Sequence, residues 1–508
     1  MSLAMNPGVR VGLMLMAALL PACVVGPDFK SPEAPKTSHY TDPVWIDADQ
    51  LDGQQLVDGM LVPAEWWEMF GSGKLDALVR RGLENSLTVA AARARLREVQ
   101  EDLKSQAGAV LFPSVDANAS SSRRKISGTS FGGESLIFTL HNASVSASYG
   151  VDLFGANTRH LESLESQINY EQFQLQAARM TLAANIVTAA VREASLREQI
   201  RATDAIIEDS RKQLSMIEKQ FELGAVAQSV VLTQRSELAQ ARTALPELHR
   251  QMQQNRHLLA VLVGELPSES KLSSGNKLPE FRLADMSLPR TLPLSLPSDL
   301  VRQRPDILAS EALLHQANAN VGLATANLYP RITISASYGS ESRTAANLFR
   351  TGSTVWDAGT GLVQPLFHGG ELRARKRGTE AALAQADANY RGVVLAAFKD
   401  VADTLLALQA DAQGLQLQRE AEQVAKASYE LSREQYTAGA VSYLEMLTAS
   451  QAYHRAAAAR AVAEGTRLAD SAALVHALGG GWWNTSATDM QEANTDETSD
   501  HATTEKQL

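Results

Sequence analysis

The sequence predicts a mainly α-helical protein with a smaller share of β-strand, built from two similar halves. Its 508 residues exceed the usual size of a single hydrophobic core, so several domains or an elongated shape are expected. Only 17 prolines and 6% aromatic residues favour long helices over a β-sandwich. The formal net charge of -10, with no Lys/Arg-rich run, argues against a nucleic-acid partner.

An internal duplication is the observation on which the two halves depend. Five short matches recur in the same order, 213 to 217 residues apart: 111–115 with 328–332, 153–155 with 366–369, 224–226 with 439–441, 232–233 with 447–448, and 262–264 with 477–479. They predict two structural repeats, 74–266 and 298–483, joined by a Pro- and Ser-rich linker at 267–297. Residues 23–73 precede the repeats, and an acidic tail at 484–508 is predicted to be disordered.

Each half shows the same order of helical segments. A helix of about 25 residues (86–110; 305–328) precedes two strands, a very long helix (159–222; 371–437) and a return helix (228–264; 442–478). Glycine and proline are scarce inside these segments, apart from Pro246, which should kink its helix. At 1.5 Å per residue the long helix reaches roughly 95 Å, about as far as the two shorter helices end to end. We therefore expect an antiparallel helical layer with the turns at one end and the strands at the other.

The turns of the two predicted helical hairpins share one sequence. Gly224, Ala225 and Val226 recur as Gly439, Ala440 and Val441. Only the second turn is followed closely by a carboxylate, that of Glu445.

The four predicted strands alternate apolar and small polar residues. From 143 to 153, Ala, Val, Ala, Tyr, Val and Leu alternate with Ser, Gly and Asp, and residues 115–119 and 332–338 follow the same pattern. The segment 355–367 alternates less clearly. Outer-membrane β-barrels have this pattern, but so does a soluble half-buried sheet. Four strands cannot close a barrel, so either the sheet is soluble or several chains share one barrel.

The N-terminal residues predict a lipoprotein signal peptide at 1–22. Arg10 precedes an apolar run of about ten residues, which is too short to span a bilayer. Leu20, Ala22 and Cys23 then fit the bacterial lipobox, although Pro21 departs from it. Cys23, the sole cysteine, is therefore predicted to be lipidated, and the alternative is a secreted protein with a free thiol. Beyond it no run of 18 or more apolar residues predicts a transmembrane helix.

No combination of residues indicates an enzyme, a cofactor site or a metal site. Ser130 lies in a Gly-x-Ser-x-Gly pattern, but this pattern needs a preceding strand and a following helix, and here two strands are predicted. The ten histidines are scattered and form no metal-binding spacing. A hydrolase is the weakest interpretation, and a structural trimeric surface protein would need sustained heptads.

Several motifs together resemble the outer-membrane efflux protein family, the TolC-type exit ducts, in the lipoprotein subfamily that includes NodT and OprM. These motifs are Cys23 to Phe29 with Pro32; Trp66, Trp67, Phe70 and Leu75; Arg304, Pro305, Asp306 and Ile307; Trp356 with 364–367 and Gly369-Gly370; Tyr436 with Gly439; and 478–483. Each motif taken alone has a simpler structural interpretation. Pro305 and Asp306 are typical of the first turn of a helix, and Trp66 and Trp67 are typical of packing in a core.

The resemblance implies a homotrimer whose chains each give four strands to a 12-stranded outer-membrane β-barrel. The barrel would continue into a long periplasmic α-helical barrel with a mixed α/β equatorial belt. The implied function is passive conduction of drugs or other toxic small molecules. A periplasmic adaptor protein and an inner-membrane pump, usually of the resistance-nodulation-division type, would deliver them. The alternative is the exit duct of a type I protein secretion system.

The resemblance also implies a gate at the periplasmic helix tips, where the adaptor is expected to bind both hairpin turns. Matching the motif at Tyr436 and Gly439 places Leu444, Glu445 and Thr448 at the constriction. Val230 and Val441 stand where related ducts often have a charged partner, so we expect an apolar closure with one ring of carboxylates. The alternative for Glu445 is a solvated charge on the helix surface.

Overall fold

The computed structural model describes residues 24–37, 39–40, 51, 53–127, 135–267 and 278–484. The predicted signal peptide, Cys23, Ser130 and the tail after residue 484 lie outside the described residues. The chain divides into two compact units, which are described separately. We call them the sheet unit (1–32, 94–172 and 309–391) and the hairpin unit (33–93, 173–308 and 392–508).

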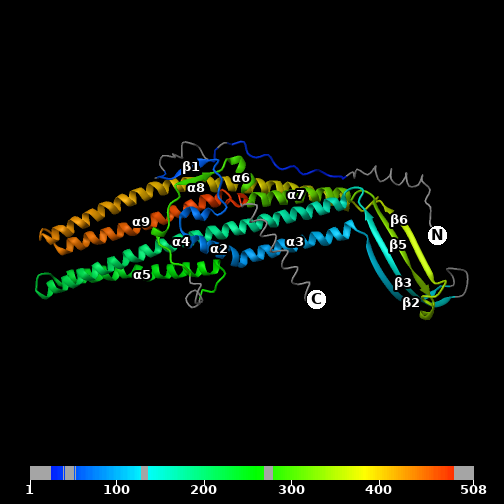
Figure 1. Ribbon diagram of the computed structural model, residues 1–508, viewed down its shortest axis with the longest axis horizontal. Coiled ribbons are helices and arrows are strands. Elements are labelled where there is room, and N and C mark those ends of the chain that lie inside the picture. Colours follow the sequence, from blue (N-terminus) through cyan, green and yellow to red (C-terminus); the bar gives the residue numbers. More distant parts are fainter. Residues whose placement is uncertain are drawn as a thin grey trace. The chain divides into compact units, whose positions relative to one another are not determined.

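The sheet unit contains one four-stranded antiparallel sheet in the order β2-β3-β5-β6 (Figure 1). Helices adjoin it at one end only. The chain passes from α3 (Leu87–Leu111) to β2 (Ser114–Ile126), from β3 (Leu136–Val151) to α4 (Ala156–Glu222), from α7 (Pro305–Ala326) to β5 (Arg331–Ser342), and from β6 (Thr354–Val363) to α8 (Glu371–Thr437). The opposite end of the sheet, where β2 is followed by β3 and β5 by β6, we call its free end.

The register of the sheet confirms the predicted alternation. Val145 lies opposite both Ala117 and Tyr338, and Tyr338 lies opposite Trp356. Opposed residues of an antiparallel sheet share a face, so these side chains form one apolar face. That face is uncovered within the chain, because Val145, Tyr338 and Trp356 are 50%, 66% and 74% exposed. β6 ends at Val363, four residues earlier than predicted, just before Pro365, which has no N–H to donate.

The segment that follows Cys23 is held on the helices of the sheet unit. Arg159 of α4 forms an ion pair with Asp28 at 2.7 Å, and its side chain is 5% exposed. Asn318 of α7 donates a hydrogen bond to the carbonyl oxygen of Pro27 at 2.9 Å. Gly26 lies so close to Gly322 that a Cβ at position 26 would be 2.5 Å from the Gly322 Cα. The first described residues therefore have a defined place beside α4 and α7.

The hairpin unit contains two helical hairpins of matched length, seen in Figure 1 as α4 beside α5 and α8 beside α9. α4 and α8 each have 67 residues. α5 (Gln228–Leu262) and α9 (Tyr443–Ala477) each have 35 residues. The bounds agree closely with prediction, and every residue of one hairpin has its equivalent 215 positions away in the other. Pro246 lies inside α5.

Short elements outside the hairpins form a core that fits the mixed α/β belt implied by the family resemblance, although the individual elements were not predicted. They are β1 (Gln55–Asp58), η3 (Trp66–Phe70), α2 (Gly73–Asn85), η6 (Leu283–Asp285), β4 (Thr291–Leu294) and α6 (Pro297–Gln303). β1 pairs in parallel with β4, which lies in the predicted linker. Trp66 and Trp67 are buried, which confirms them as packing residues, and Phe281 and Leu292 of the linker are fully buried.

Arg304 joins three helices of the hairpin unit where α7 begins. Its guanidinium pairs with Asp306 at 2.7 Å and with Asp400 of α8 at 3.3 Å. It also donates to the carbonyl oxygen of Ala477, at the end of α9. Pro305 starts α7 and Asp306 lies in its first turn, as predicted. The Arg-Pro-Asp motif therefore serves helix packing.

Among the helices that the structure describes, none combines the length and the hydropathy needed to cross a bilayer.

Candidate functional site

The two hairpins turn at equivalent glycines with left-handed backbones, φ +71° at Gly224 and +72° at Gly439. In each turn the glycine N–H donates to the carbonyl three residues back, at 2.9 and 3.0 Å. The next residue, Ala225 or Ala440, donates five residues back at 2.8 Å. This pair of bonds is the Schellman motif, which needs a positive φ that glycine adopts without strain. The same local rule therefore produces both breaks in the helical pattern.

The start of the return helix differs between the two tips. At α9, the Ser442 hydroxyl accepts the Glu445 N–H at 3.1 Å, and the Glu445 carboxylate accepts the Ser442 N–H at 2.8 Å. These reciprocal bonds form a capping box. At α5, Ala227 is the N-cap and offers no side-chain bond, and Val230 occupies the position of Glu445. The carboxylate that distinguishes the second tip therefore caps its helix, a role that the Ser-x-x-Glu pattern could have revealed.

The other predicted gate residues lie around the second tip. Leu444 and Tyr436 are 43% and 41% exposed, and the Tyr436 and Tyr443 rings are 5.1 Å apart. The Thr448 hydroxyl donates to the carbonyl oxygen of Leu444 at 2.9 Å, so it is bonded within its own helix. Leu444 and Tyr436 are therefore exposed apolar and aromatic side chains of this tip that a neighbour could contact.

Buried amides link the two hairpins further along the helices. Gln451 of α9 donates to the Ser210 hydroxyl at 3.1 Å and to the Gln213 side-chain oxygen at 3.0 Å, both on α4. Gln234 of α5 donates to the same Gln213 oxygen at 3.0 Å. All four side chains are buried, so these bonds are made where water cannot replace them easily. The sequence alone does not reveal this layer, because it depends on the register between helices.

An acidic group and a histidine lie beside these amides. The Ser450 hydroxyl donates to the buried Asp209 carboxylate. His454 Nε2 is 3.9 Å from the same carboxylate. Burial lowers the pKa of His454 below its usual value, and the Asp209 charge opposes this only in part. His454 is therefore mainly neutral near neutral pH.

A charged cluster lies between α8 and α9. Arg467 is fully buried and donates to the carbonyl oxygens of Leu408 and Leu51. Burial, followed by a hydrogen bond with Asp470 and its charge, raises the pKa of Asp411 to about 7, and the Arg467 charge opposes this rise. The two carboxyl groups therefore share a proton near neutral pH.

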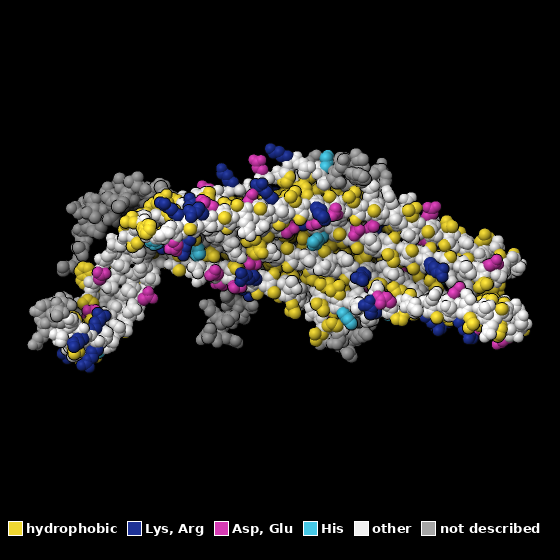
Figure 2. Space-filling view, turned by 180° about the vertical axis from the view of Figure 1, so that it is seen from behind, with side chains coloured by type: hydrophobic (Ala, Val, Ile, Leu, Met, Phe, Trp, Pro, Cys, Tyr) yellow, Lys and Arg dark blue, Asp and Glu magenta, His cyan; other side chains and the backbone are white. Residues whose placement is uncertain are grey.

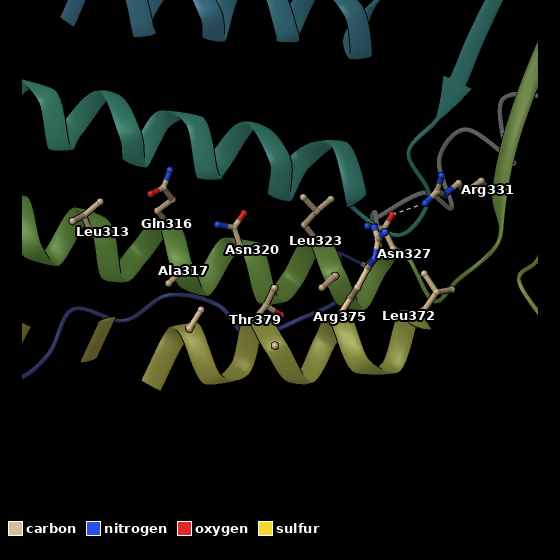
Figure 3. Close-up of a pocket in the computed structure, with 13 residues that line it drawn as sticks. Leu313, Gln316, Ala317, Asn320, Leu323, Asn327, Arg331, Leu372, Arg375 and Thr379 are labelled. Atoms are coloured by element: carbon tan, nitrogen blue, oxygen red, sulfur yellow. Dashed lines mark hydrogen bonds between the residues drawn. The ribbon is translucent and has the colours of Figure 1, made fainter. Parts of the chain in front are cut away.

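A pocket of about 480 Å³ lies in the sheet unit between α7 and the first turns of α8 (Figure 3). Asn320 and Gln316 of α7 and Thr379 and Arg375 of α8 line it with small apolar residues. The lining residues include no carboxylate, imidazole or thiol.

No catalytic or metal-binding arrangement was found in the described chain. Within the described ranges, no group of three or more His, Cys, Asp or Glu side chains could hold a metal ion. Ser130 lies outside them, but the described elements on either side of it are β2 and β3. A nucleophile elbow requires a helix after the serine.

The family model described as outer membrane efflux protein matches residues 78–265 and 296–480, most of both halves. The chain belongs to this family. This efflux protein is 32% identical over 424 residues to the pyoverdine export outer membrane protein OpmQ of Pseudomonas putida, covering 82% of the chain and 88% of the relative. It is 28% identical over 492 residues to the toluene efflux pump outer membrane protein TtgC of Pseudomonas putida, covering 95% and 98%.

Solved structures agree with this assignment. The outer-membrane channel OprN matches with a TM-score of 0.78 at 26% identity, over 91% of this chain and 100% of that one. The Campylobacter jejuni CmeC outer membrane channel matches with a TM-score of 0.81 over 93% and 98%, and at 22% identity it supports the fold alone.

The efflux protein is an outer-membrane channel, the exit duct of an efflux system, and its helices lie in the periplasm. The predicted family, fold class, location and function are confirmed. Its homologues are channel proteins rather than enzymes.

Proposed function

We propose that three copies of this chain form one duct, which receives its cargo from a periplasmic adaptor and an inner-membrane pump of the resistance-nodulation-division type. Within the chain, β2 and β6 each pair along one edge only. They run in opposite directions, so β6 of one copy would pair antiparallel with β2 of the next. Three sheets would give a closed 12-stranded barrel with no free edge and the apolar face outward. The unpaired edges and the uncovered Tyr338 and Trp356 support this assembly.

We propose small organic molecules as the cargo, and no chemical step on them. The support is the printed activity of the relatives, which export toluene, antibiotics or pyoverdine. Deleting the gene should raise sensitivity to solvents and antibiotics, and expression of the protein should restore tolerance. A deletion strain that keeps its tolerance but stops secreting a polypeptide would instead support the type I alternative.

We propose that the duct is lipid-anchored through Cys23. Its position directly before the segment held by Arg159 and Asn318 supports this, because the acyl chains would then be attached to a fixed part of the chain. Mass spectrometry of the mature N-terminus should show a diacylglyceryl cysteine. An unmodified thiol at Cys23 would contradict the proposal.

We propose that the periplasmic gate lies at the second tip. Leu444 would form an apolar ring around the three-fold axis, with Tyr436 beside it. Glu445 would give an acidic ring while holding the start of α9, and Thr448 would stiffen the same turn through its bond to Leu444. Both tips, at Gly224-Ala225-Val226 and Gly439-Ala440-Val441, would contact the adaptor, because they are the ends of the hairpins.

The gate is tested by single-channel conductance in planar bilayers. Leu444→Ala should raise conductance, because a wider apolar ring admits more water. Leu444→Ala/Glu445→Ala should raise conductance further. Glu445→Gln removes the charge but keeps the capping box, so it should change cation preference more than conductance. The matched controls are Ser229→Ala and Val230→Ala at the equivalent positions of the first tip. If the Leu444→Ala/Glu445→Ala channel conducts as the wild type does, the gate lies elsewhere.

A further inference from the structure

The apolar face of the sheet ends in basic side chains at the free end. Along β2, Val115, Ala117 and Ala119 share one face, and by the same alternation Ser121, Arg123 and Lys125 continue it. The register agrees, since Arg123 lies opposite Thr139 and Lys125 opposite Ile137 of β3. Figure 2 shows lysine and arginine side chains gathered at this end of the sheet.

The apolar part of this face has the length of a membrane core. On β3 it runs from Val151 to Ala143, which is nine residues. A tilted transmembrane β-strand needs about 9–11 residues to cross the hydrocarbon core. Beyond Ala143, the same face carries His141 and Ser121, and then Arg123 and Lys125. Arg123 and Lys125 therefore lie four and six residues beyond the last apolar pair, Ala119 and Ala143, on the head-group side of the apolar band.

The basic residues of this face have no acidic partner in the described chain. Arg123 and Lys125 are exposed, and no described carboxylate forms an ion pair with either. The helices lie in the periplasm and adjoin the other end of the sheet, so the free end faces the outer leaflet and the cell exterior. Two cations at this depth, without an acidic partner among the described residues, favour an anionic lipid head group.

We propose that Arg123 and Lys125 bind the phosphate groups of phosphorylated glycolipids of the lipid A class in the outer leaflet. Arginine can bind a phosphate through two parallel N–H bonds, and lysine adds a mobile point charge. The proposal rests on the trimeric barrel of the proposed function, which places this face against lipid. Each trimer would hold three such lipid sites, one on each chain.

Arg124 provides a matched control because it lies one residue away on the opposite face. It is paired with Phe138 of β3, and the Arg343 guanidinium lies 5.3 Å from the Phe138 ring centroid. These side chains face the interior of the proposed barrel. A variant at Arg124 therefore removes one positive charge from the same stretch, as each single variant does, but removes no cation from the lipid-facing side.

The experiment measures lipid retained by purified full-length trimers in phosphatidylcholine nanodiscs, using native mass spectrometry. The probe is bis-phosphorylated lipid A, with phosphate-free lipid A as the second arm and excess inorganic phosphate as the third. A basic residue at an anionic lipid surface contributes about fivefold in affinity, so Arg123→Gln/Lys125→Gln should weaken binding about 25-fold. Arg124→Gln should bind like the wild type, and phosphate-free lipid A should bind all variants equally weakly.

Each other outcome overturns the proposal. If Arg123→Gln/Lys125→Gln bound lipid A as tightly as the wild type, the lipid site would not lie on this face. The same would follow if Arg124→Gln lost as much lipid A affinity. Displacement of lipid A by inorganic phosphate would show a phosphate site rather than a glycolipid site. Trimer formation is checked first on gels, because a chain that never forms trimers would contradict the proposed assembly and not the lipid site. If the double variant does not assemble, Arg123→Gln and Lys125→Gln are measured singly, each with an expected loss of about fivefold.

Discussion

The first and second hairpins have the same helix lengths and the same turns, but they differ in the polar groups that fix them. Both turn through a Schellman motif. Only α9 starts with a capping box, and only the second hairpin contains the Asp411, Arg467 and Asp470 cluster. At the equivalent positions the first hairpin has Leu196, Met252 and Asn255.

The difference separates the features that both hairpins share from those present in one hairpin only. Backbone geometry at the turn depends on one glycine and is common to both hairpins. The cap and the charged cluster depend on single side chains, so they can change without moving a helix. The second hairpin therefore has a capping box that the first lacks, and it is the one in which we place the gate.

The largest expected effect comes from removing Arg467. Arg467→Met leaves the Asp411 and Asp470 carboxyls without their buried cation and leaves the carbonyls of Leu408 and Leu51 without a donor. Breaking one side of a buried charge cluster costs about 3–5 kcal/mol. The loss should appear as a lower unfolding temperature of the purified protein, measured by circular dichroism.

The control for this change copies the first hairpin. Arg467→Met/Asp411→Leu/Asp470→Asn recreates its neutral set, and replacing a whole buried cluster by neutral groups is often close to neutral. We expect the triple variant to regain most of the stability lost in the single variant. A triple variant less stable than Arg467→Met would show that the two hairpins are not interchangeable at this level.

A smaller effect is expected from exchanging the caps. Ser442→Ala should cost about 1 kcal/mol of local stability at the start of α9, because the Glu445 N–H loses its acceptor. Ala227→Ser/Val230→Glu would build the missing capping box on α5 and should gain a similar amount. Hydrogen exchange of the first-turn amides of α9 and α5 measures both changes. Equal exchange of wild-type and Ser442→Ala trimers would mean that the capping box does not stabilise this tip.

The smallest effect is a pH dependence of the second hairpin. The pKa of Asp411 rises from 3.8 to about 7 on folding, so the folded state holds a proton that the unfolded state releases. This contribution is complete below 3.8 and is lost as pH rises through about 7. Because Asp411 is only partly buried and is screened by solvent, we expect less than about 1 kcal/mol. The unfolding temperature should fall as pH rises from 3.8 to about 7, and Asp411→Asn should flatten that fall.

The long helices could be predicted because their rules are local. The scarcity of glycine and proline, and a glycine at each turn, fixed α8 at residues 371–437 in both prediction and structure. β1 and β4 were missed because four residues are too few for a pattern, and their pairing joins Gln55 to Thr291, far along the chain.

The site was predicted less completely than the fold. The turns follow from sequence spacing, whereas the Gln451–Gln213 bond depends on how two helices are rotated against each other. A single sequence does not show how the helices are rotated against each other. The capping role of Glu445 was readable from Ser442, three residues earlier, and was overlooked in favour of its charge.

The equal lengths of the two hairpins also limit how the chain can change. Each added residue lengthens a helix by about 1.5 Å. An insertion in only one helix of a hairpin would therefore shift its packing against the other helix. Tolerated length changes must therefore occur in both arms of a hairpin, and in both hairpins if their ends are to stay level. Such a coordinated change requires several simultaneous mutations. The helix lengths of 67 and 35 residues are therefore difficult to change by single insertions.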